Sequence, residues 1–130
     1  MSEEEYQYWL EAANLDQEAA QQLFAAGNYS ACTFHCQQAV EKAFKACLYY
    51  SGRALFTHSL TNLAEELSKR LGIDLPEDIL TACRELDFHY IPSRYPGTTS
   101  IKKLYTKEKA GSALEWMEEC LSYVRALKFQ

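Results

Sequence analysis

Turn-forming residues are scarce in this chain. Only 5 glycines and 3 prolines occur among 130 residues, and long stretches contain neither. This scarcity favours long helices over many short strands, because strands need frequent turns. The length predicts one domain over residues 1–130, and a hydrophobic content of 48% is enough for a single core. We therefore expect an all-α protein.

A long apolar run is also missing. No stretch approaches the roughly 18 apolar residues that span a bilayer. The chain begins with Ser2 followed by Glu3, Glu4 and Glu5, and this charge is the opposite of that in a signal peptide. We expect a cytoplasmic protein that does not enter a membrane.

Patterns that bind metals or cofactors are absent. No CxxC pair, glycine-rich phosphate loop or Ser-His-Asp order is present, so we expect neither a metal nor a cofactor. The cysteines are odd in number, and we expect them to be small core residues in a reducing compartment. They are Cys32, Cys36, Cys47, Cys83 and Cys120.

Basic residues are unevenly distributed. None precedes Lys42, whereas seven acids occur up to Glu41, and the net charge is −5. This balance argues against a broad surface that coats nucleic acid. Between Arg84 and Lys109 the balance reverses, with six basic residues against three acids. A local basic region attracts phosphate even on an acidic protein, although a solvated lysine-rich loop explains it equally well.

Apolar residues at helical spacing predict a bundle of about five helices. Small residues on the second helix allow close packing, which predicts that it lies at the centre. The short link at Gly27-Asn28 requires the first two helices to form an antiparallel hairpin. The expected ranges are about 2–26, 29–50, 59–71, 75–90 and 106–127, with an irregular segment over 91–105.

Local signals define the ends of three helices. Ser2 with Glu5 resembles a capping box at the start of the first helix. Thr57 or Ser59 can cap the third helix. Pro92 restricts the residue before it, so the fourth helix is expected to stop near Tyr90.

Three stretches together resemble the HEPN family of prokaryotic helical domains. They are residues 34–46 (FHCQQAVEKAFKA), residues 57–60 (THSL) with Leu63, and residues 90–96 (YIPSRYP). The resemblance covers essentially the whole chain. It implies an up-and-down helical bundle that commonly forms a homodimer and binds nucleotides or RNA. Many members sit beside a minimal nucleotidyltransferase as a two-protein, toxin–antitoxin-like pair, and others are metal-independent endoribonucleases.

Arg94 and Tyr95 are the main candidates for binding a nucleotide or RNA. Arginine offers a planar fork of donors to phosphate, and a tyrosine ring can stack on a base. The alternative is structural, with Arg94 tying the loop to a helix end and Tyr95 in the core. Lys42 and Lys45 share one helix face and would line the same site if that face meets the loop, or else form ion pairs with acids.

Arg84 and His89 are the candidates for ribonuclease catalysis. The ribonuclease branch of the family uses an arginine followed four to six residues later by a histidine, which suits proton transfer and stabilisation of a charged phosphate. Arg53 and His58 fit the same spacing, although His58 is better explained as part of a helix start. Five helical residues place Arg84 and His89 about 140° apart, so they converge only if the helix ends between them or across a dimer axis.

Three hypotheses follow from the sequence. The first is a nucleotide- or RNA-binding homodimer that partners a nucleotidyltransferase. The second is a metal-independent endoribonuclease that uses Arg84 and His89. The third is a scaffold whose helices mediate assembly only.

Overall fold

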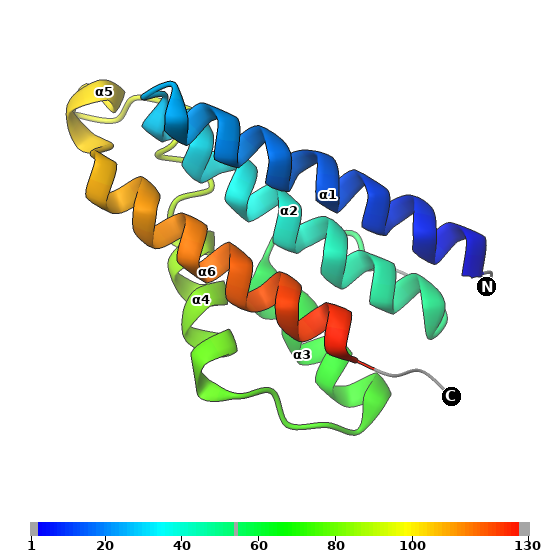
Figure 1. Cartoon of the computed structure of the whole chain (residues 1–130). Helices are drawn as coiled ribbons and strands as arrows, with labels where there is room; N and C mark the ends of the chain where they lie inside the picture. The colour runs from blue at the N-terminus through cyan, green and yellow to red at the C-terminus, as the bar shows by residue number, and fades with distance from the viewer. Residues whose placement is uncertain (1–2, 54, 128–130) are drawn as a thin grey trace.

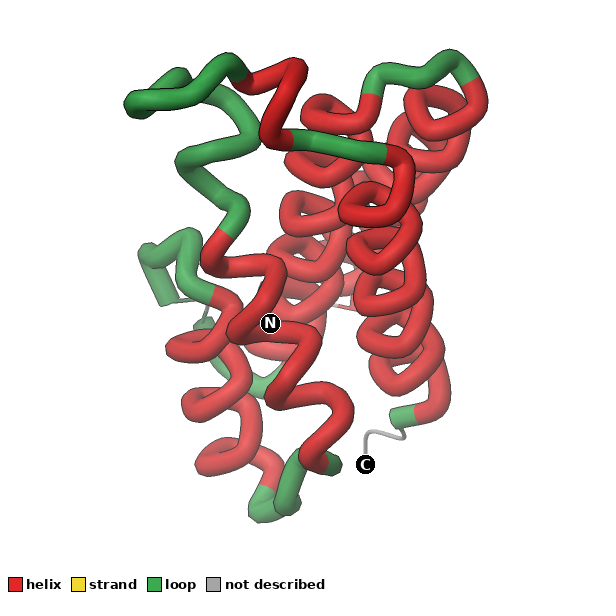
Figure 2. The backbone as a smooth tube through the Cα atoms, turned by 90° about the vertical axis from the view of Figure 1, so that its left-hand side faces the viewer, coloured by secondary structure: helices red, strands yellow, loops and turns green. Residues whose placement is uncertain are grey.

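All regular structure in the described part of the chain is helical. The structure is a computed structural model that describes residues 3–53 and 55–127. Within these ranges Figures 1 and 2 show a bundle with no strand. The helices are α1 (Glu3–Ala25), α2 (Tyr29–Tyr50), α3 (Leu60–Leu71), α4 (Glu77–Phe88), α5 (Ile101–Leu104) and α6 (Lys107–Ala126). The predicted all-α bundle is confirmed.

α1 and α2 form the predicted antiparallel hairpin (Figure 1). Gly27 has a φ of 80°, a left-handed conformation that glycine adopts without a steric cost. The next residue closes the turn, because the Asn28 amide donates to the carbonyl of Leu23 at 2.8 Å. The acids Glu3–Glu5 lie at the positive end of the α1 dipole. The predicted capping residue Ser2 lies outside the described residues.

α2 is the central helix, as its small residues predict. It packs against each of the other five helices. Its small-residue stripe is fully buried, and the five cysteines are buried and free. Small side chains let neighbouring backbones approach closely, so the sequence of α2 explains its place in the core. The stripe is Cys32, Cys36, Ala39, Ala43 and Cys47.

α3 begins and ends at recognisable signals. The Ser59 hydroxyl accepts a hydrogen bond from the Asn62 amide at 3.1 Å, so Ser59 is the capping residue. Thr57 supports it from outside the helix, where its hydroxyl accepts from the Ser59 amide at 3.1 Å. At the other end Gly72 has a φ of 63°.

α4 is shorter than predicted. It starts at Glu77, directly after Pro76, and ends at Phe88, two residues before the expected end at Tyr90. The amides of His89 and Tyr90 bond to carbonyls three residues back, at 3.1 and 3.2 Å, so the chain tightens into turns before it reaches Pro92.

The segment over 91–105 is not wholly irregular. It contains the single turn α5, which Figure 1 shows at the end of the bundle near the α1–α2 turn. The amide of Tyr105 donates to the carbonyl of Ile101 at 3.0 Å, and the Tyr105 side chain is only 3% exposed. Burial of this ring therefore anchors the turn. The turn is too short to show helical periodicity in the sequence.

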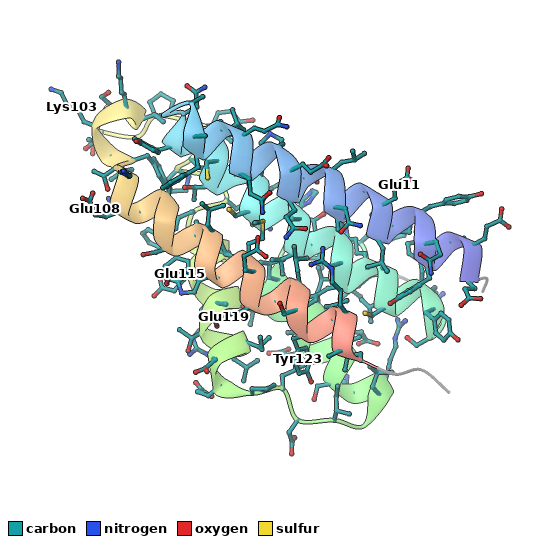
Figure 3. All side chains as sticks on the ribbon, in the orientation of Figure 1. Glu11, Lys103, Glu108, Glu115, Glu119 and Tyr123 are labelled. Carbon is teal, nitrogen blue, oxygen red and sulfur yellow. The ribbon has the colours of Figure 1, made fainter. Side chains whose placement is uncertain are left out.

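The face formed by α1 and α6 is acidic. Figure 3 shows Glu11 on α1 and Glu108, Glu115 and Glu119 on α6, all exposed. Such a face repels phosphate, which leaves α2, α3 and the segment after α4 as the candidate places for a phosphate site. No helix in the described residues is long and apolar enough to cross a membrane.

Candidate functional site

The three stretches that resemble the HEPN family meet in one place. Residues from the first stretch lie on α2, the second precedes α3, and the third follows α4. They meet through contacts of Glu41 with His58 and of His58 with Tyr90. Segments far apart in the sequence thus build a single polar and aromatic cluster.

Glu41 organises the polar half of this cluster. It is 4% exposed, and its carboxylate accepts hydrogen bonds from Lys45 Nζ at 3.0 Å, His58 Nδ1 at 3.1 Å and Gln38 Nε2 at 3.3 Å. Three donors around a buried carboxylate, one of them an ammonium group, compensate for its burial. Because the Glu41 carboxylate accepts in this contact, His58 Nδ1 is the donor.

The backbone around His58 is also held by α2. Gln37 is fully buried and donates from Nε2 to the carbonyl of His58 at 2.8 Å. Gln38 donates in turn to the amide oxygen of Gln37 at 2.7 Å. The imidazole is therefore fixed at its backbone and at Nδ1, while its side chain remains 62% exposed.

Arg94 is held by aromatic rings. Its Cζ lies 4.3 Å from the ring centroid of Tyr90 and 4.9 Å from those of Phe34 and Tyr95. Such cation–π contacts stabilise a guanidinium group without neutralising it. We call these three rings the aromatic cage. Arg94 Nε donates to the carbonyl of Tyr90 at 3.1 Å. This one nitrogen therefore holds the loop to the end of α4, as expected if Arg94 has a structural role.

The terminal nitrogens of Arg94 have no protein partner within the described residues. No described carboxylate lies within ion-pair distance of Arg94, whereas acids pair with Lys42, Lys45, Arg70 and Arg84. Arg94 is partly exposed. The guanidinium group is thus oriented, charged and open to an anion.

Tyr90 joins the two halves of the cluster. Its ring stacks on the imidazole of His58 with centroids 5.1 Å apart and planes 20° apart, and it also contacts Arg94. We call Glu41, His58, Tyr90 and Arg94, together with Lys45 and the aromatic cage, the cluster site.

Asp87 holds the start of α3, just after His58, through contacts that the sequence did not reveal. Its carboxylate accepts from the amides of Leu60 and Thr61 at 2.7 and 3.0 Å, and from the Thr61 hydroxyl at 2.9 Å. An anion at the positive end of α3 satisfies amides that have no partner within the helix. Because Asp87 lies just before Tyr90, this contact brings the start of α3 against the end of α4.

Tyr95 lies at the surface beside a hollow. Its ring is 56% exposed, so it is not part of the core. The hollow has a volume of about 300 Å³ and is formed mainly by the segment after α4. Its lining residues are Ile91, Pro92, Tyr95, Pro96, Gly97, Thr98, Thr99 and Leu104.

Arg84 and His89 are not brought together. Arg84 is exposed and points back along α4, where Nη2 donates to Glu77 at 3.2 Å and to Thr81 at 3.1 Å. His89 Nδ1 lies 2.7 Å from the hydroxyl of Tyr105. α4 ends immediately before His89, but this end does not turn the two side chains toward each other.

His89 and Tyr105 close the segment between them. Burial lowers the pKa of His89, with a further contribution from the charge of Lys109, and burial raises the pKa of Tyr105 to about 12. Both groups are therefore uncharged at neutral pH, and one hydrogen bond joins His89 Nδ1 and the Tyr105 hydroxyl. This bond connects the two ends of the segment that carries Arg94. We call it the His89–Tyr105 clasp.

Lys42 and Lys45 are both ion-paired. Lys42 Nζ lies 2.6 Å from the buried carboxylate of Asp16, which also contacts His35 Nδ1 at 2.8 Å. Lys45 pairs with Glu41, so only Lys45 belongs to the cluster site. Neither lysine contacts Arg94. Among the described residues, no group of three or more His, Cys, Asp or Glu side chains is arranged to hold a metal ion.

Similarity to a known family extends over nearly the whole chain. The family model described as the HEPN domain matches residues 6–127. Among curated proteins, none matches the chain. Three solved structures are similar along nearly their whole length.

A protein from Thermus thermophilus shares 32% identity with a TM-score of 0.86, covering 92% of this chain and 95% of that one. An archaeal HEPN homologue shares 29% identity with a TM-score of 0.78, covering 96% and 97%. A HEPN domain protein from Thermotoga maritima shares 26% identity with a TM-score of 0.74, covering 91% and 94%. The predicted resemblance is confirmed by the family match and by these folds, and the chain belongs to the HEPN domain family.

Proposed function

We propose that this protein binds a nucleotide or RNA through the cluster site, with Arg94 as the phosphate ligand. The observation that carries the proposal is the state of Arg94, whose guanidinium group is held by the aromatic cage and has no described carboxylate partner. A charged fork whose position is already fixed loses little entropy when it binds phosphate.

Tyr95 is the proposed base-stacking residue. Its exposed ring lies beside Arg94 and borders the hollow of about 300 Å³. Bases of single-stranded RNA and of nucleotides commonly stack on exposed aromatic rings. The acidic face of α1 and α6 confines such binding to this local site.

The proposal is tested by measuring the affinity of a fluorescently labelled RNA hexamer for the wild type, Arg94→Ala and Arg84→Ala at several salt concentrations. Arg94→Ala should weaken binding and lower the slope of log affinity against log salt by about one, because one phosphate contact is lost. Arg84→Ala is the matched control from the same basic region and should bind like the wild type. Equal affinity of all three proteins would sink the proposal.

A homodimer and a nucleotidyltransferase partner in a toxin–antitoxin-like pair are part of the same proposal. The family supports both, and the exposed apolar side chains of Phe88 and Ile91 offer contact area near the cluster site. Light scattering of the wild type and of a Phe88→Ser, Ile91→Ser double variant tests the homodimer. A monomeric wild type at working concentration would contradict it.

The endoribonuclease hypothesis has a separate test. Wild type, Arg84→Ala and His89→Ala are incubated with labelled RNA in a chelator, after each is shown to be folded. Because Arg84 and His89 contact different neighbours, we expect neither substitution to abolish a cleavage activity. Cleavage by the wild type that both variants lose would establish the hypothesis and overturn our preference for binding.

A further inference from the structure

The chain enters α3 through a tight turn that exposes an aromatic ring. The amide of Thr57 donates to the carbonyl of Leu55 at 3.1 Å, which closes a three-residue turn with Phe56 at its tip. Thr57 is held in turn, because its hydroxyl accepts from the Ser59 amide at 3.1 Å. Phe56 is 100% exposed, so its ring adds nothing to the core of its own chain. Aromatic side chains are enriched where proteins contact one another.

A groove with an apolar lining lies beside this turn, and we call it the α3 groove. It is bordered by α3, by the connection from α3 to α4 and by Leu55 of the turn, and its volume is about 590 Å³. Pockets of roughly 300–1,000 Å³ hold whole drug-sized ligands, so a single phenyl ring fits. Because Phe56 is fully exposed, its ring does not fill the groove of its own chain. The apolar lining residues are Leu55, Ala64, Leu75 and Leu80.

The charges around the α3 groove complement the charge beside Phe56. Glu65 and Asp74 line the groove, are exposed and have no ion-pair partner among the described residues. Lys69 is the one basic residue that lines it within the described chain, so the free acids outnumber the free cation. Arg53, three residues before Phe56, is exposed and has no described carboxylate partner. The turn is thus apolar and basic, whereas the groove is apolar and acidic.

We infer that Phe56 of one copy of this chain enters the α3 groove of a second copy, with Arg53 of the first copy against the acids on the rim. The turn and the groove are neighbours on one surface. A two-fold axis between two copies therefore places each ring in the groove of the other, and the contact closes as a pair. The turn is already fixed by its own hydrogen bonds, so little entropy is lost when it docks.

This contact is separate from the one proposed above through Phe88 and Ile91. The test therefore measures self-association by sedimentation velocity in the wild type and in the Phe88→Ser, Ile91→Ser double variant. Adding Phe56→Ser should raise the dissociation constant at least tenfold in both, because a central aromatic anchor is lost. Tyr8→Ser is the matched control, since Tyr8 is also an exposed aromatic residue but lies on α1, and it should leave the association unchanged.

Reversal of the charges tests the second half of the contact. Arg53→Glu alone, or Glu65→Lys with Asp74→Lys, should weaken the association by about threefold to fivefold. A variant with all three substitutions should recover the affinity of the wild type, because opposite charges face each other again. All these positions are exposed, and thermal unfolding verifies that each variant is folded.

The inference has clear ways to fail. Association that is unchanged by Phe56→Ser, or that Tyr8→Ser weakens equally, overturns the docking of Phe56. A triple charge variant that stays as weak as Arg53→Glu overturns the placement of Arg53 against the rim. None of these outcomes alters RNA binding through Arg94, so the proposed function is judged by its own experiment.

Discussion

Two arginines that lie ten positions apart differ in the use that the fold makes of them. Arg84 lies on the exposed face of α4, and its Nη2 is already bonded to Glu77 and Thr81. Arg94 lies in the aromatic cage with no described carboxylate partner. Arg84 matches a catalytic spacing and Arg94 does not, yet only Arg94 retains an available charge. A spacing in the sequence identifies candidate residues. The contacts that each side chain makes in the fold decide whether its charged group is free to bind a ligand.

The two histidines show the same contrast. His89, which fits the catalytic spacing, is half-buried and bonded to Tyr105. His58 is held by a buried carboxylate and has an exposed side chain. A carboxylate behind an imidazole fixes its tautomer, which is how many functional histidines are oriented.

Replacement of Arg94 is expected to have the largest effect. Arg94→Ala should lower RNA affinity by roughly tenfold to a hundredfold, because a charge-assisted contact to phosphate is removed. Arg94→Lys keeps the charge but loses the planar fork and the stacking, so it should bind with intermediate affinity. Titration of labelled RNA at one fixed salt concentration ranks the three proteins. If Arg94→Lys binds as the wild type does, the fork geometry has no role.

Removal of the Asp87 carboxylate is expected to have the next largest effect. Asp87→Ala leaves two amides at the start of α3 without their acceptor and should lower the free energy of unfolding by about 2 kcal/mol. Urea denaturation measures the change. The control is Asp74→Ala at an exposed position, which should stay within about 0.5 kcal/mol of the wild type.

Asp87→Ala also sharpens the comparison of the histidines. Removal of the Asp87 carboxylate should loosen His58 from Tyr90, while His89 keeps its bond to Tyr105. An Asp87→Ala protein as stable as the wild type would show that solvent replaces the carboxylate.

The His89–Tyr105 clasp should be visible in the pH dependence of stability. Burial lowers the pKa of His89 below its ordinary 6.5, so below about pH 6.5 the unfolded chain binds a proton first and stability falls. Tyr105 has its pKa raised from 10.0 to about 12, so between these values the unfolded chain loses a proton first and stability falls again.

Matched variants isolate the two arms of this profile. His89→Gln should flatten the acidic arm, and Tyr105→Phe should flatten the alkaline arm, in unfolding free energies measured from about pH 5 to pH 11. Both should lower stability near neutral pH by about 1 kcal/mol, because the hydrogen bond is lost. Profiles parallel to that of the wild type would show that the pair does not titrate as described.

Replacement of Arg84 is expected to have the smallest effect. The pair of Arg84 with Glu77 is exposed on both sides, and such pairs contribute between zero and about 1 kcal/mol. Arg84→Ala should therefore unfold at nearly the same urea concentration as the wild type and bind RNA with the same affinity. A tenfold loss of affinity in this variant would reverse the contrast between the two arginines.

The sequence by itself determined the helical class, the antiparallel hairpin, the central place of α2 and the family. These features depend on local chemistry, such as the left-handed turn at Gly27, and on apolar periodicity. Both can be recognised from residues that are close together in the sequence. The sequence also named Arg94 and Tyr95, because their residue types suit phosphate and base.

Only the tertiary structure decided which candidates have free groups. Glu41 and His58 lie 17 positions apart, and Asp87 lies 26 and 27 positions from the amides that it caps. No local pattern encodes such pairings, since they form only when separate helices pack together. The same packing gave Lys42 its carboxylate partner on α1 and placed Phe34 of α2 beside Arg94, whereas Lys45 and Arg84 pair with carboxylates on their own helices. The environment of a charge is set by the groups that the fold brings beside it.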